Sequence, residues 1–309
     1  MSVGSVATAV QGREPLNASP TILCFGEALW DVGPSGRVPG GAPMNVALRL
    51  ARLGARVRFV SRVGSDALGT ELLEYLAASG LPVEEVQFDE QAPTGRVLVD
   101  VADPHDVRYE ICAPAAWDFI EAEPAAPDVL VYGSLAARHA VSHATLRRLL
   151  DVADLKVFDV NLRPPHDRRE EIEPLLARAD WVKLNEDELA VVCRWLGLVP
   201  DPANPSVVLE ELARRLALDV VCVTRGPRGA WMWKDGRLHT HPGLQVDVVD
   251  TVGCGDAFLA CLLWDLLAGE RPDEALGRAC ALGALVAMHE GANPDVGEAE
   301  IRALRDLRR

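Results

Sequence analysis

The stretch Asp250-Thr251-Val252-Gly253-Cys254-Gly255-Asp256-Ala257-Phe258 decides the fold, because it joins a glycine turn to the first residues of an apolar helix. The helix is indicated by apolar residues that recur at helical spacing, namely Phe258, Leu259, Leu262, Leu263 and Leu266. Val248 and Val249 are expected to end a β-rich segment just before the turn. The two glycines then let the backbone reverse tightly.

The backbone NH groups of Gly253, Cys254, Gly255 and Asp256 are expected at a helix N-terminus, where the helix dipole favours a negative charge such as a phosphate. Asp256 lies beside them and can accept a proton from a hydroxyl that attacks this phosphate. The turn therefore predicts phosphoryl transfer, with Asp256 as the general base and the NH groups as an anion hole. The alternative is that Asp256 only caps the helix, a common use of aspartate.

A second glycine turn opens another helix at Gly40-Gly41-Ala42-Pro43-Met44-Asn45. Pro43 suits the first helical position, and Gly54 suits the residue after the last turn. Asn45 falls in the first turn, where its amide can offer a donor and an acceptor to sugar hydroxyls. Capping or solvent exposure is its alternative role. The predicted buried face of this helix contains Val46, Leu50 and Leu53.

Short apolar runs alternate with helical patterns, which predicts a mainly parallel sheet covered on both faces. The predicted strands are Thr21–Phe25, Val57–Val60, Asp128–Tyr132, Lys156–Val160, Trp181–Leu184 and Val220–Thr224. In such a sheet, ligands bind beyond the carboxyl ends of the strands. The polar residues and the glycine expected at these ends are Asp31, Asn161, Arg163, Asn185, Glu188, Arg225 and Gly226.

One segment breaks the alternation and predicts a lid over the cleft. Arg96–Val101 and Val107–Ile111 are predicted to form two strands around the turn-forming residues 103–106. They should make an antiparallel hairpin outside the main sheet. Thr94 and Arg96 enter this hairpin, and either could touch a substrate.

A second hairpin is predicted at an edge of the main sheet. It joins Trp231–Trp233 to Arg237–His241 around Lys234-Asp235-Gly236. His239 and His241 fall on one face of its second strand. Metal binding there is disfavoured, because no third ligand lies nearby in the sequence.

The composition of the 309-residue chain limits its class. Its 49% of hydrophobic residues can bury a large core, and no apolar run approaches the roughly 20 residues of a membrane helix. A net charge of −15 disfavours nucleic acid and anionic membranes. Seven cysteines without a C-x-x-C pair favour a reduced, cytoplasmic setting. Residues 1–19 are expected to be a disordered tail preceding a domain of residues 20–309.

Two other nucleotide-binding classes lack their motifs. None of the three lysines, Lys156, Lys183 and Lys234, follows a glycine, so the P-loop motif G-x-x-x-x-G-K-[ST] is excluded. A dinucleotide oxidoreductase would need G-x-G-x-x-G after the first strand, where this chain has Gly26-Glu27-Ala28-Leu29.

Eight ordered motifs make the chain resemble the ribokinase-like, phosphofructokinase-B type carbohydrate kinases, and among them most closely the fructokinases. They are Gly26-Glu27-Ala28-Leu29-Trp30-Asp31, Gly40 to Gly54, Val63 to Gly69, Pro93-Thr94-Gly95, Asp159-Val160-Asn161-Leu162-Arg163, Lys183 to Glu188, Val223 to Gly229 and Asp250 to Asp256. The resemblance runs from about Ile22 to about Pro294. It implies an α/β three-layer sandwich with a mainly parallel sheet and a small β lid, built from elements near 31–40 and 93–115.

The resemblance also implies roles for individual residues of an ATP-dependent sugar kinase. The implied sugar and phosphate contacts are Asp31, Gly41, Asn45, Thr94, Arg96, Arg163 and Asp256. The implied nucleotide contacts are Asn185, Thr224, Arg225, Gly226, Gly229, Gly253 and Gly255. Asn185 and Glu188 would help place Mg²⁺ through waters. Asp250, with the stretch near Gly291-Ala292-Asn293, would hold a K⁺ ion, unless Asp250 only braces the turn.

The expected substrate is D-fructose, which would be converted to fructose 6-phosphate. Gly40 to Asn45 resembles fructokinases more than ribokinases, and Tyr109-Glu110-Ile111-Cys112 lacks the Tyr-Arg pairing of 2-keto-3-deoxygluconate kinases. A kinase for 2-keto-3-deoxygluconate, ribose or tagatose, or an inactive sugar-binding regulator, remains an alternative. Cys254 departs from the family pattern, in which a small residue is usual. The resemblance further implies a homodimer formed through the lid.

Overall fold

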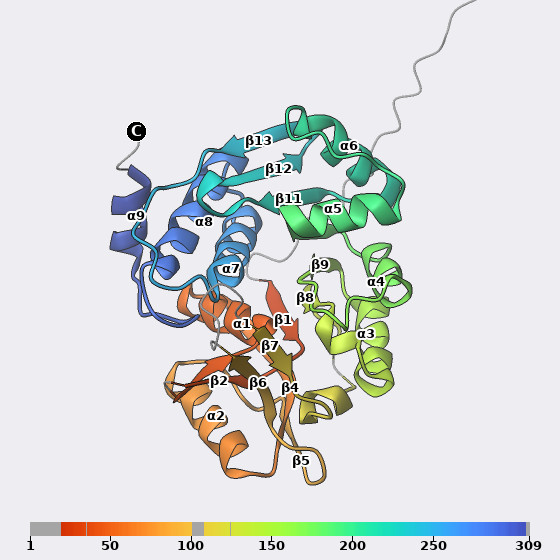
Figure 1. Cartoon of the computed structure of the whole chain (residues 1–309), viewed down its shortest axis with the longest axis vertical. Helices are drawn as coiled ribbons and strands as arrows, with labels where there is room; N and C mark the ends of the chain where they lie inside the picture. The colour runs from red at the N-terminus through yellow and green to blue at the C-terminus, as the bar shows by residue number, and fades with distance from the viewer. Residues whose placement is uncertain (1–19, 35, 101–107, 124, 307–309) are drawn as a thin grey trace, which may run out of the picture.

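The computed structural model describes residues 20–34, 36–100, 108–123 and 125–306. Within these residues, nine strands form one sheet (Figure 1). Their order is β13 (Arg237–His241), β12 (Ala230–Lys234), β11 (Val220–Thr224), β10 (Trp181–Asn185), β9 (Leu155–Asp159), β8 (Val129–Gly133), β1 (Thr21–Phe25), β4 (Arg56–Gly64) and β5 (Val86–Asp89). The strands from β11 to β5 are parallel, and β12 and β13 are antiparallel. Both the parallel sheet and the edge hairpin were predicted and are confirmed.

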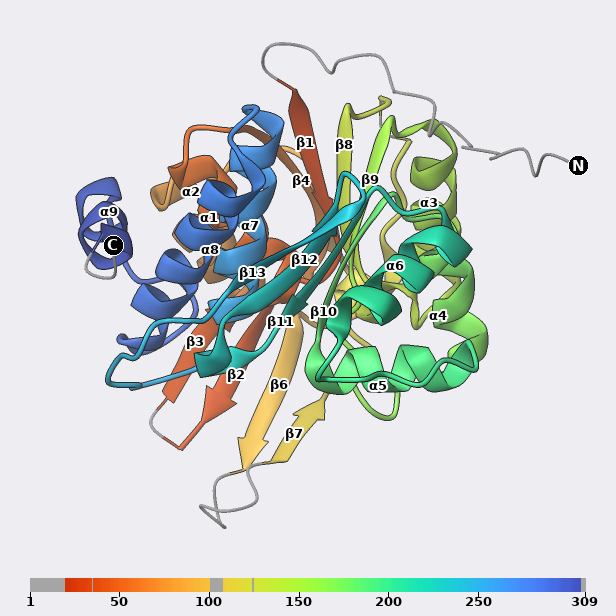
Figure 2. The ribbon, with the colours of Figure 1, turned by 90° about the horizontal axis from the view of Figure 1, so that it is seen from above.

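Helices cover both faces of this sheet, so the molecule has three layers (Figure 2). One face carries α3 (Ala140–Val152), α4 (Arg169–Leu176), α5 (Glu186–Trp195) and α6 (Pro205–Leu216). The other face carries α1 (Ala42–Arg52), α2 (Ala67–Ala78), α7 (Cys254–Leu267) and α8 (Pro272–Ala287), with α9 (Glu298–Asp306) packed outside α8. Within the described ranges, no helix has the length and apolar character needed to cross a membrane.

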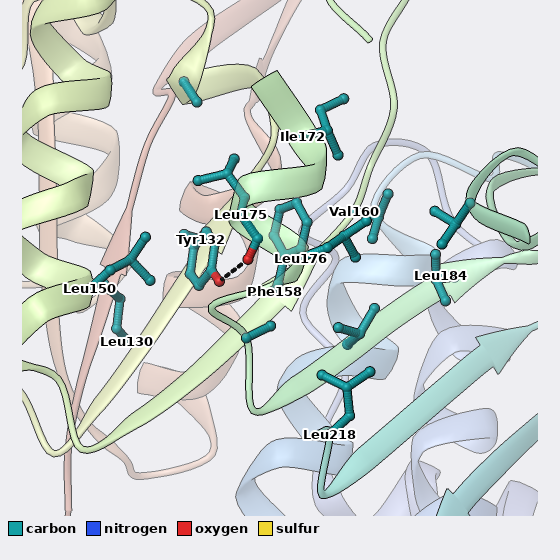
Figure 3. Close-up of a cluster of buried hydrophobic side chains, with 14 of the residues drawn as sticks. Leu130, Tyr132, Leu150, Phe158, Val160, Ile172, Leu175, Leu176, Leu184 and Leu218 are labelled. Carbon is teal, nitrogen blue, oxygen red and sulfur yellow. Dashed lines mark hydrogen bonds between the residues drawn. The ribbon is translucent and has the colours of Figure 1, made fainter. Parts of the chain in front are cut away.

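The sheet is apolar on both faces because successive side chains of each strand enter different cores. In β1, Leu23 and Phe25 enter the core under α3 and α4, whereas Ile22 and Cys24 enter the core under α1 and α7. Figure 3 shows the first core, where Tyr132 stacks on Phe158 with ring centroids 4.9 Å apart. The buried Tyr132 hydroxyl donates a hydrogen bond of 3.1 Å to the carbonyl oxygen of Leu175.

A second, four-stranded sheet projects from one end of the main sheet (Figure 2). Its order is β3 (Gly36–Gly40), β2 (Leu29–Gly33), β6 (Gly95–Asp100) and β7 (Arg108–Ile111). The antiparallel pairing of β6 with β7 confirms the predicted hairpin. The predicted turn at residues 103–106 and the predicted tail at residues 1–19 lie outside the described residues. We call this four-stranded sheet the lid sheet.

One local prediction was wrong. Val248 and Val249 do not end a strand, since β13 stops at His241 and the following segment has no strand. Both valines are exposed. The backbone NH groups of Val249 and Asp250 instead donate to the carbonyl oxygen of Ala287. The segment therefore follows the end of α8 rather than an edge of the sheet.

Candidate active site

The carboxyl ends of the parallel strands place the predicted polar residues at one edge of the main sheet. Asn185 is the last residue of β10, and Thr224 is the last residue of β11. Arg163 follows β9 by four residues, after Asn161, which has a positive φ of 39°. Because these strands are parallel neighbours, their carboxyl ends lie at the same edge of the sheet, where ligands usually bind in open α/β sheets.

The glycine turn and the N-terminus of α7 are built as predicted. Gly253 is the residue before the helix, and its φ of 76° is one that residues with a side chain rarely adopt. A Cβ on Gly253 would also lie 2.7 Å from the carbonyl oxygen of Ala292. The loop at residues 291–293 thus packs directly on the turn. This contact fixes the direction of the NH groups at the start of α7.

Asp256 lies in the first turn of α7 and is held by a relay of two amides. The Asn45 side chain donates from Nδ2 to Asp256 Oδ2 at 2.8 Å. Asn45 Oδ1 in turn accepts from Asn293 Nδ2 at 2.7 Å. Asn45 is buried, and the protein itself uses both ends of its amide. The relay therefore points to Asn45 as a support of Asp256, while its predicted contact with a sugar stays a prediction.

The environment of Asp256 raises its affinity for a proton. Burial raises the pKa of Asp256 to about 6, and the charge of Asp159 acts in the same direction. Lys183, the hydrogen bond from Asn45 and the charge of Arg163 lower the pKa and partly oppose this shift. A carboxylate with a pKa of about 6 is ionised at neutral pH yet more basic than an ordinary aspartate.

Asp250 ties the turn to the loop at residues 291–293. Its Oδ1 accepts from the NH of Val252 at 3.0 Å, and its Oδ2 accepts from the NH of Gly291 at 3.0 Å. This is the bracing role that the sequence left open for Asp250. Each carboxylate oxygen keeps a lone pair beyond these bonds, so bracing and a cation contact are compatible.

Asp31 belongs to β2 of the lid sheet and is half-buried. Its carboxylate packs against Gly40, where a Cβ would collide with Oδ2. Burial raises the pKa of Asp31 to about 6, with Arg163 lowering it and the charges of Asp256 and Asp250 raising it. The charges of Arg163 and Asp256 both act on the Asp31 carboxyl, so these three groups lie around one space. Gly41 adjoins this space as the residue before α1, with a φ of 113°.

Sequence reasoning assigned no role to Glu27, which is buried at the same place. Its side chain is 2% exposed, and Oε2 has no hydrogen-bond partner among the described residues. Burial raises the pKa of Glu27 to about 7, opposed by the NH groups of Glu27 and Ala42 and by Arg163, and assisted by Asp256. In the sequence, only the motif Gly26 to Asp31 points to Glu27, because an isolated glutamate carries no signal that it is buried.

Two predicted substrate contacts are not brought into this space. Thr94 is buried, and its hydroxyl donates to Asp66 Oδ1 at 2.6 Å and accepts from the NH of Gly64 at 3.0 Å. Thr94 thus braces the base of the lid sheet. Arg96 pairs in register with Trp30, which turns toward α2 and donates to the Leu68 carbonyl oxygen. Since side chains alternate along a strand, Arg96 lies on the face opposite Asp31.

Asn185 and Glu188 form a capping box at the start of α5. Asn185 Oδ1 accepts from the NH of Glu188 at 2.9 Å, and Glu188 Oε2 accepts from the NH of Asn185 at 2.8 Å. Glu188 Oε1 accepts from the NH of Leu162 at 3.0 Å. Burial raises the pKa of Glu188, with Lys183 lowering it and Asp159 raising it. The remaining lone pairs of these oxygens suit water molecules around a Mg²⁺ ion.

The predicted nucleotide loop follows β11 and is firmly held. Thr224 Oγ1 donates to the Leu184 carbonyl oxygen at 3.3 Å. The Arg225 guanidinium lies 3.9 Å from the centroid of Trp231 and donates to Glu186 at 3.2 Å. Gly226 and Gly229 have positive φ angles of 53° and 79°, and a Cβ on Gly229 would collide with the His241 carbonyl oxygen. These contacts shape the loop through Arg225 and the two glycines.

The described residues contain no group of three or more His, Cys, Asp or Glu side chains that could hold a metal ion. His239 is buried and its Nδ1 lies 2.7 Å from Asp273 Oδ1, so its ring bonds to α8. A Mg²⁺ ion does not need three protein ligands, because waters and phosphate oxygens commonly complete its shell.

Comparisons with known proteins identify the family of this chain. A sequence model described as pfkB family carbohydrate kinase matches residues 1–298. The fructokinase of Klebsiella pneumoniae is 32% identical over 299 residues, which cover 88% of this chain and 94% of that protein. The fructokinase of Vibrio cholerae O395, solved with fructose, ADP and a calcium ion, is 25% identical with a TM-score of 0.80 and covers 93% of this chain and 99% of that one. A double mutant of that fructokinase, solved with fructose, ADP and a potassium ion, is 24% identical with a TM-score of 0.80 and covers 94% and 99%.

Proposed function

The chain belongs to the pfkB family of carbohydrate kinases, and from this premise we propose that it transfers the γ-phosphate of ATP to the 6-hydroxyl of D-fructose. An ATP-dependent sugar kinase is the activity of the family, and fructose is the substrate named for the relatives. The observation that carries the proposal is the position of Asp256. Its carboxylate adjoins both the NH groups that open α7 and the space lined by Asp31.

The proton and the phosphoryl group have separate sites in this mechanism. As the sugar oxygen bonds to the γ-phosphorus, the hydroxyl proton passes to the Asp256 carboxylate, and the bond from phosphorus to the leaving oxygen of ADP breaks. The NH groups of Gly253 to Asp256 stabilise the charge on the transferred group. Cys254 contributes its NH to this set. Burial raises the pKa of its thiol to about 12, so the thiol stays neutral beside phosphate.

Asp31, Gly41 and Arg163 would line the sugar and phosphate side of the cleft, and Asn185, Thr224 to Gly229, and the α7 turn the nucleotide side. A Mg²⁺ ion would be held through waters by Asn185 and Glu188, where it would neutralise phosphate charge. The lid sheet would close over the sugar and keep out water that could otherwise hydrolyse ATP.

Potassium is a further part of the proposal. Asp250 braces the turn, and the loop at residues 291–293 returns to Gly253, so a cation bound between them would stiffen the NH groups. Turnover at saturating Mg-ATP should be several-fold higher in KCl than in matched tetramethylammonium chloride. Equal rates in the two salts would remove the cation and leave Asp250 a brace only.

The lid sheet also supports a homodimer. Val38 and Tyr109 are large apolar residues on one face of this sheet, and both are exposed in the single chain. Pairing two lid sheets would cover such surface. Sedimentation of the wild-type protein and a Tyr109→Lys variant tests this. We expect a dimeric wild type and a monomeric variant, and a monomeric wild type would contradict the proposal.

The use of ATP and seven cysteines that are all free support a cytoplasmic location.

A substrate screen tests the proposed activity. Purified protein is given Mg-ATP with D-fructose, tagatose, ribose, 2-keto-3-deoxygluconate or a nucleoside, and ADP release is followed while ³¹P NMR locates the new phosphate. We expect the highest kcat/KM with fructose and the phosphate on carbon 6. A higher kcat/KM for another sugar would replace fructose, and sugar binding without transfer would indicate an inactive regulator.

A further inference from the structure

A buried ion pair lies beneath the α7 turn and has no part in the mechanism above. Lys183 of β10 and Asp159 of β9 are register partners in adjacent parallel strands. Lys183 Nζ lies 3.0 Å from each oxygen of the Asp159 carboxylate. Their side chains are only 9% and 5% exposed. This close, two-oxygen contact offsets the cost of burying the two charges.

The ammonium is in direct reach of the turn itself. A Cβ built on Gly255 would lie 3.0 Å from Lys183 Nζ and 3.7 Å from its Cε. Gly255 is the second residue of α7, between Cys254 and Asp256. The glycine at this position therefore leaves room for a charge directly under the NH groups that face the phosphate.

The two charges of the pair act on Asp256 in opposite directions. Asp159 raises the pKa of Asp256, and Lys183 lowers it. The other groups that face Asp256 come from different elements: Asn45 of α1 through its hydrogen bond, and Arg163 after β9 through its charge. Asp256 in turn raises the pKa of Asp31, Glu27 and Cys254.

We propose that Lys183 and Asp159 are positioning residues for phosphoryl transfer, in which the ammonium supports the Gly253 to Asp256 turn and the pair balances the charge on Asp256. This rests on the proposed role of Asp256 as the base. A pair that served only to hold β9 and β10 together could lie anywhere along these strands. This one is the last register pair of the two strands, at the carboxyl end of β9, and it packs against Gly255, the residue beside Asp256.

The test compares Asp159→Asn with the double variant Asp159→Asn/Lys183→Met. The first leaves the ammonium without its counter-charge, and the second removes both charges. Lys183→Met alone is unsuitable, because it leaves the buried Asp159 carboxylate without a partner, and that carboxylate would then take up a proton. The readout is the pH dependence of kcat/KM, which reports ionisations of the free enzyme.

In Asp159→Asn the remaining ammonium lowers the pKa of Asp256, so the fall of kcat/KM at acid pH should begin about one pH unit lower than in the double variant. At a given acid pH, this is a tenfold difference in kcat/KM. Asp31 also titrates near pH 6, but neither Lys183 nor Asp159 is among the charges that shift it, so a displacement reports on Asp256. Identical acid limbs in the two variants, with only thermal stability altered, would leave the pair a structural feature and overturn the proposal.

If asparagine at position 159 prevents folding, alanine in the same two backgrounds gives the same contrast. Circular dichroism and ATP binding establish that each variant is folded. Failure of this inference is distinguishable from failure of the proposed function. If the wild type is active, Asp256→Asn is inactive and the two Asp159 variants have the same pH profile of kcat/KM, only the role of the pair is removed. If the wild type is inactive, the kinase mechanism itself is removed.

Discussion

Asp256 and Asp31 titrate alike but stand in very different surroundings. Burial raises the pKa of each carboxyl to about 6. Asp256 lies on a helix whose Ala260 and Leu263 are fully buried in the cores of the main sheet, and the amide relay from Asn293 through Asn45 orients it. Asp31 lies half-buried in the small lid sheet, between Trp30 and Val32, whose side chains pack on the core under α1 and α7.

The difference shows that a shifted pKa locates a functional space without assigning roles within it. A base must be held in place relative to the phosphate, and the rigid floor of the cleft provides this for Asp256. A residue that grips sugar hydroxyls can belong to an element that closes after the sugar enters. We therefore expect the residues around Asp256 to determine the rate of phosphoryl transfer and the lid sheet to determine sugar binding.

The largest expected effect comes from removing the base on the floor. Asp256→Ala should lower kcat by roughly two to four orders of magnitude, because loss of a general base acts mainly in the transition state. Steady-state assays with fructose and ATP measure this. Asp154→Ala, which removes an exposed carboxylate before β9, is the matched control and should leave kcat unchanged. Near wild-type turnover by Asp256→Ala would contradict the role of Asp256 as the general base and with it the contrast to Asp31.

The second effect belongs to the lid sheet. Asp31→Ala should raise the KM for fructose about ten- to a hundredfold, the cost of losing hydrogen bonds to a charged group. The KM for ATP should change much less. Arg96→Ala is the control from the same sheet, and because its side chain lies on the opposite face it should leave the KM for fructose near the wild-type value. Equal effects of the two variants would contradict the assigned faces.

The third effect is the pH dependence of the wild-type enzyme. Below the folded-state pKa of about 6, Asp256 is protonated and cannot accept the proton of the sugar hydroxyl. For one essential group of the free enzyme, kcat/KM should therefore fall about tenfold for each pH unit on the acid side and level off above pH 7. An acid limb near pH 4, the ordinary aspartate range, would mean that Asp256 is not desolvated as described.

The smallest effect concerns the support of the base. Asn293→Ala removes the donor that fixes the Asn45 amide, so kcat should fall about two- to tenfold, the worth of one neutral hydrogen bond. The KM for fructose should hardly change. A matching rise in KM with unchanged kcat would instead place Asn45 on the sugar, as the sequence predicted.

The sequence predicted the main sheet well because its strands are continuous apolar runs with helical patterns between them. Thr21–Phe25 and Val220–Thr224 were predicted with the bounds that the structure has. Val86–Asp89 was missed, since four residues with only two buried carry little pattern. Val248 and Val249 carry a strand-like composition, yet their backbone is bound by the end of α8, which no local pattern reveals.

The site was predicted in outline and incompletely in detail. Residues that follow parallel strands were found because strand ends meet at one edge of the sheet. The relay from Asn293 to Asn45 was missed because its members lie 248 positions apart and an asparagine carries no signal of its partner. The side of the lid sheet on which Arg96 lies depends on the register between β2 and β6. The turn-forming residues and the spacing of the sequence do not determine this register.

The central claim is that Asp256 acts in phosphoryl transfer and Asp31 in sugar binding. It is tested most directly by measuring fructose affinity and a single phosphoryl transfer separately in Asp256→Asn and Asp31→Asn. Fructose affinity is measured by calorimetry with a non-transferable ATP analogue, and transfer by rapid quench at saturating fructose. Asp256→Asn should transfer at least about a hundredfold more slowly with nearly unchanged affinity, and Asp31→Asn should bind at least about tenfold more weakly with nearly unchanged transfer. A variant of Asp256 that transfers at the wild-type rate but binds fructose weakly would contradict the account.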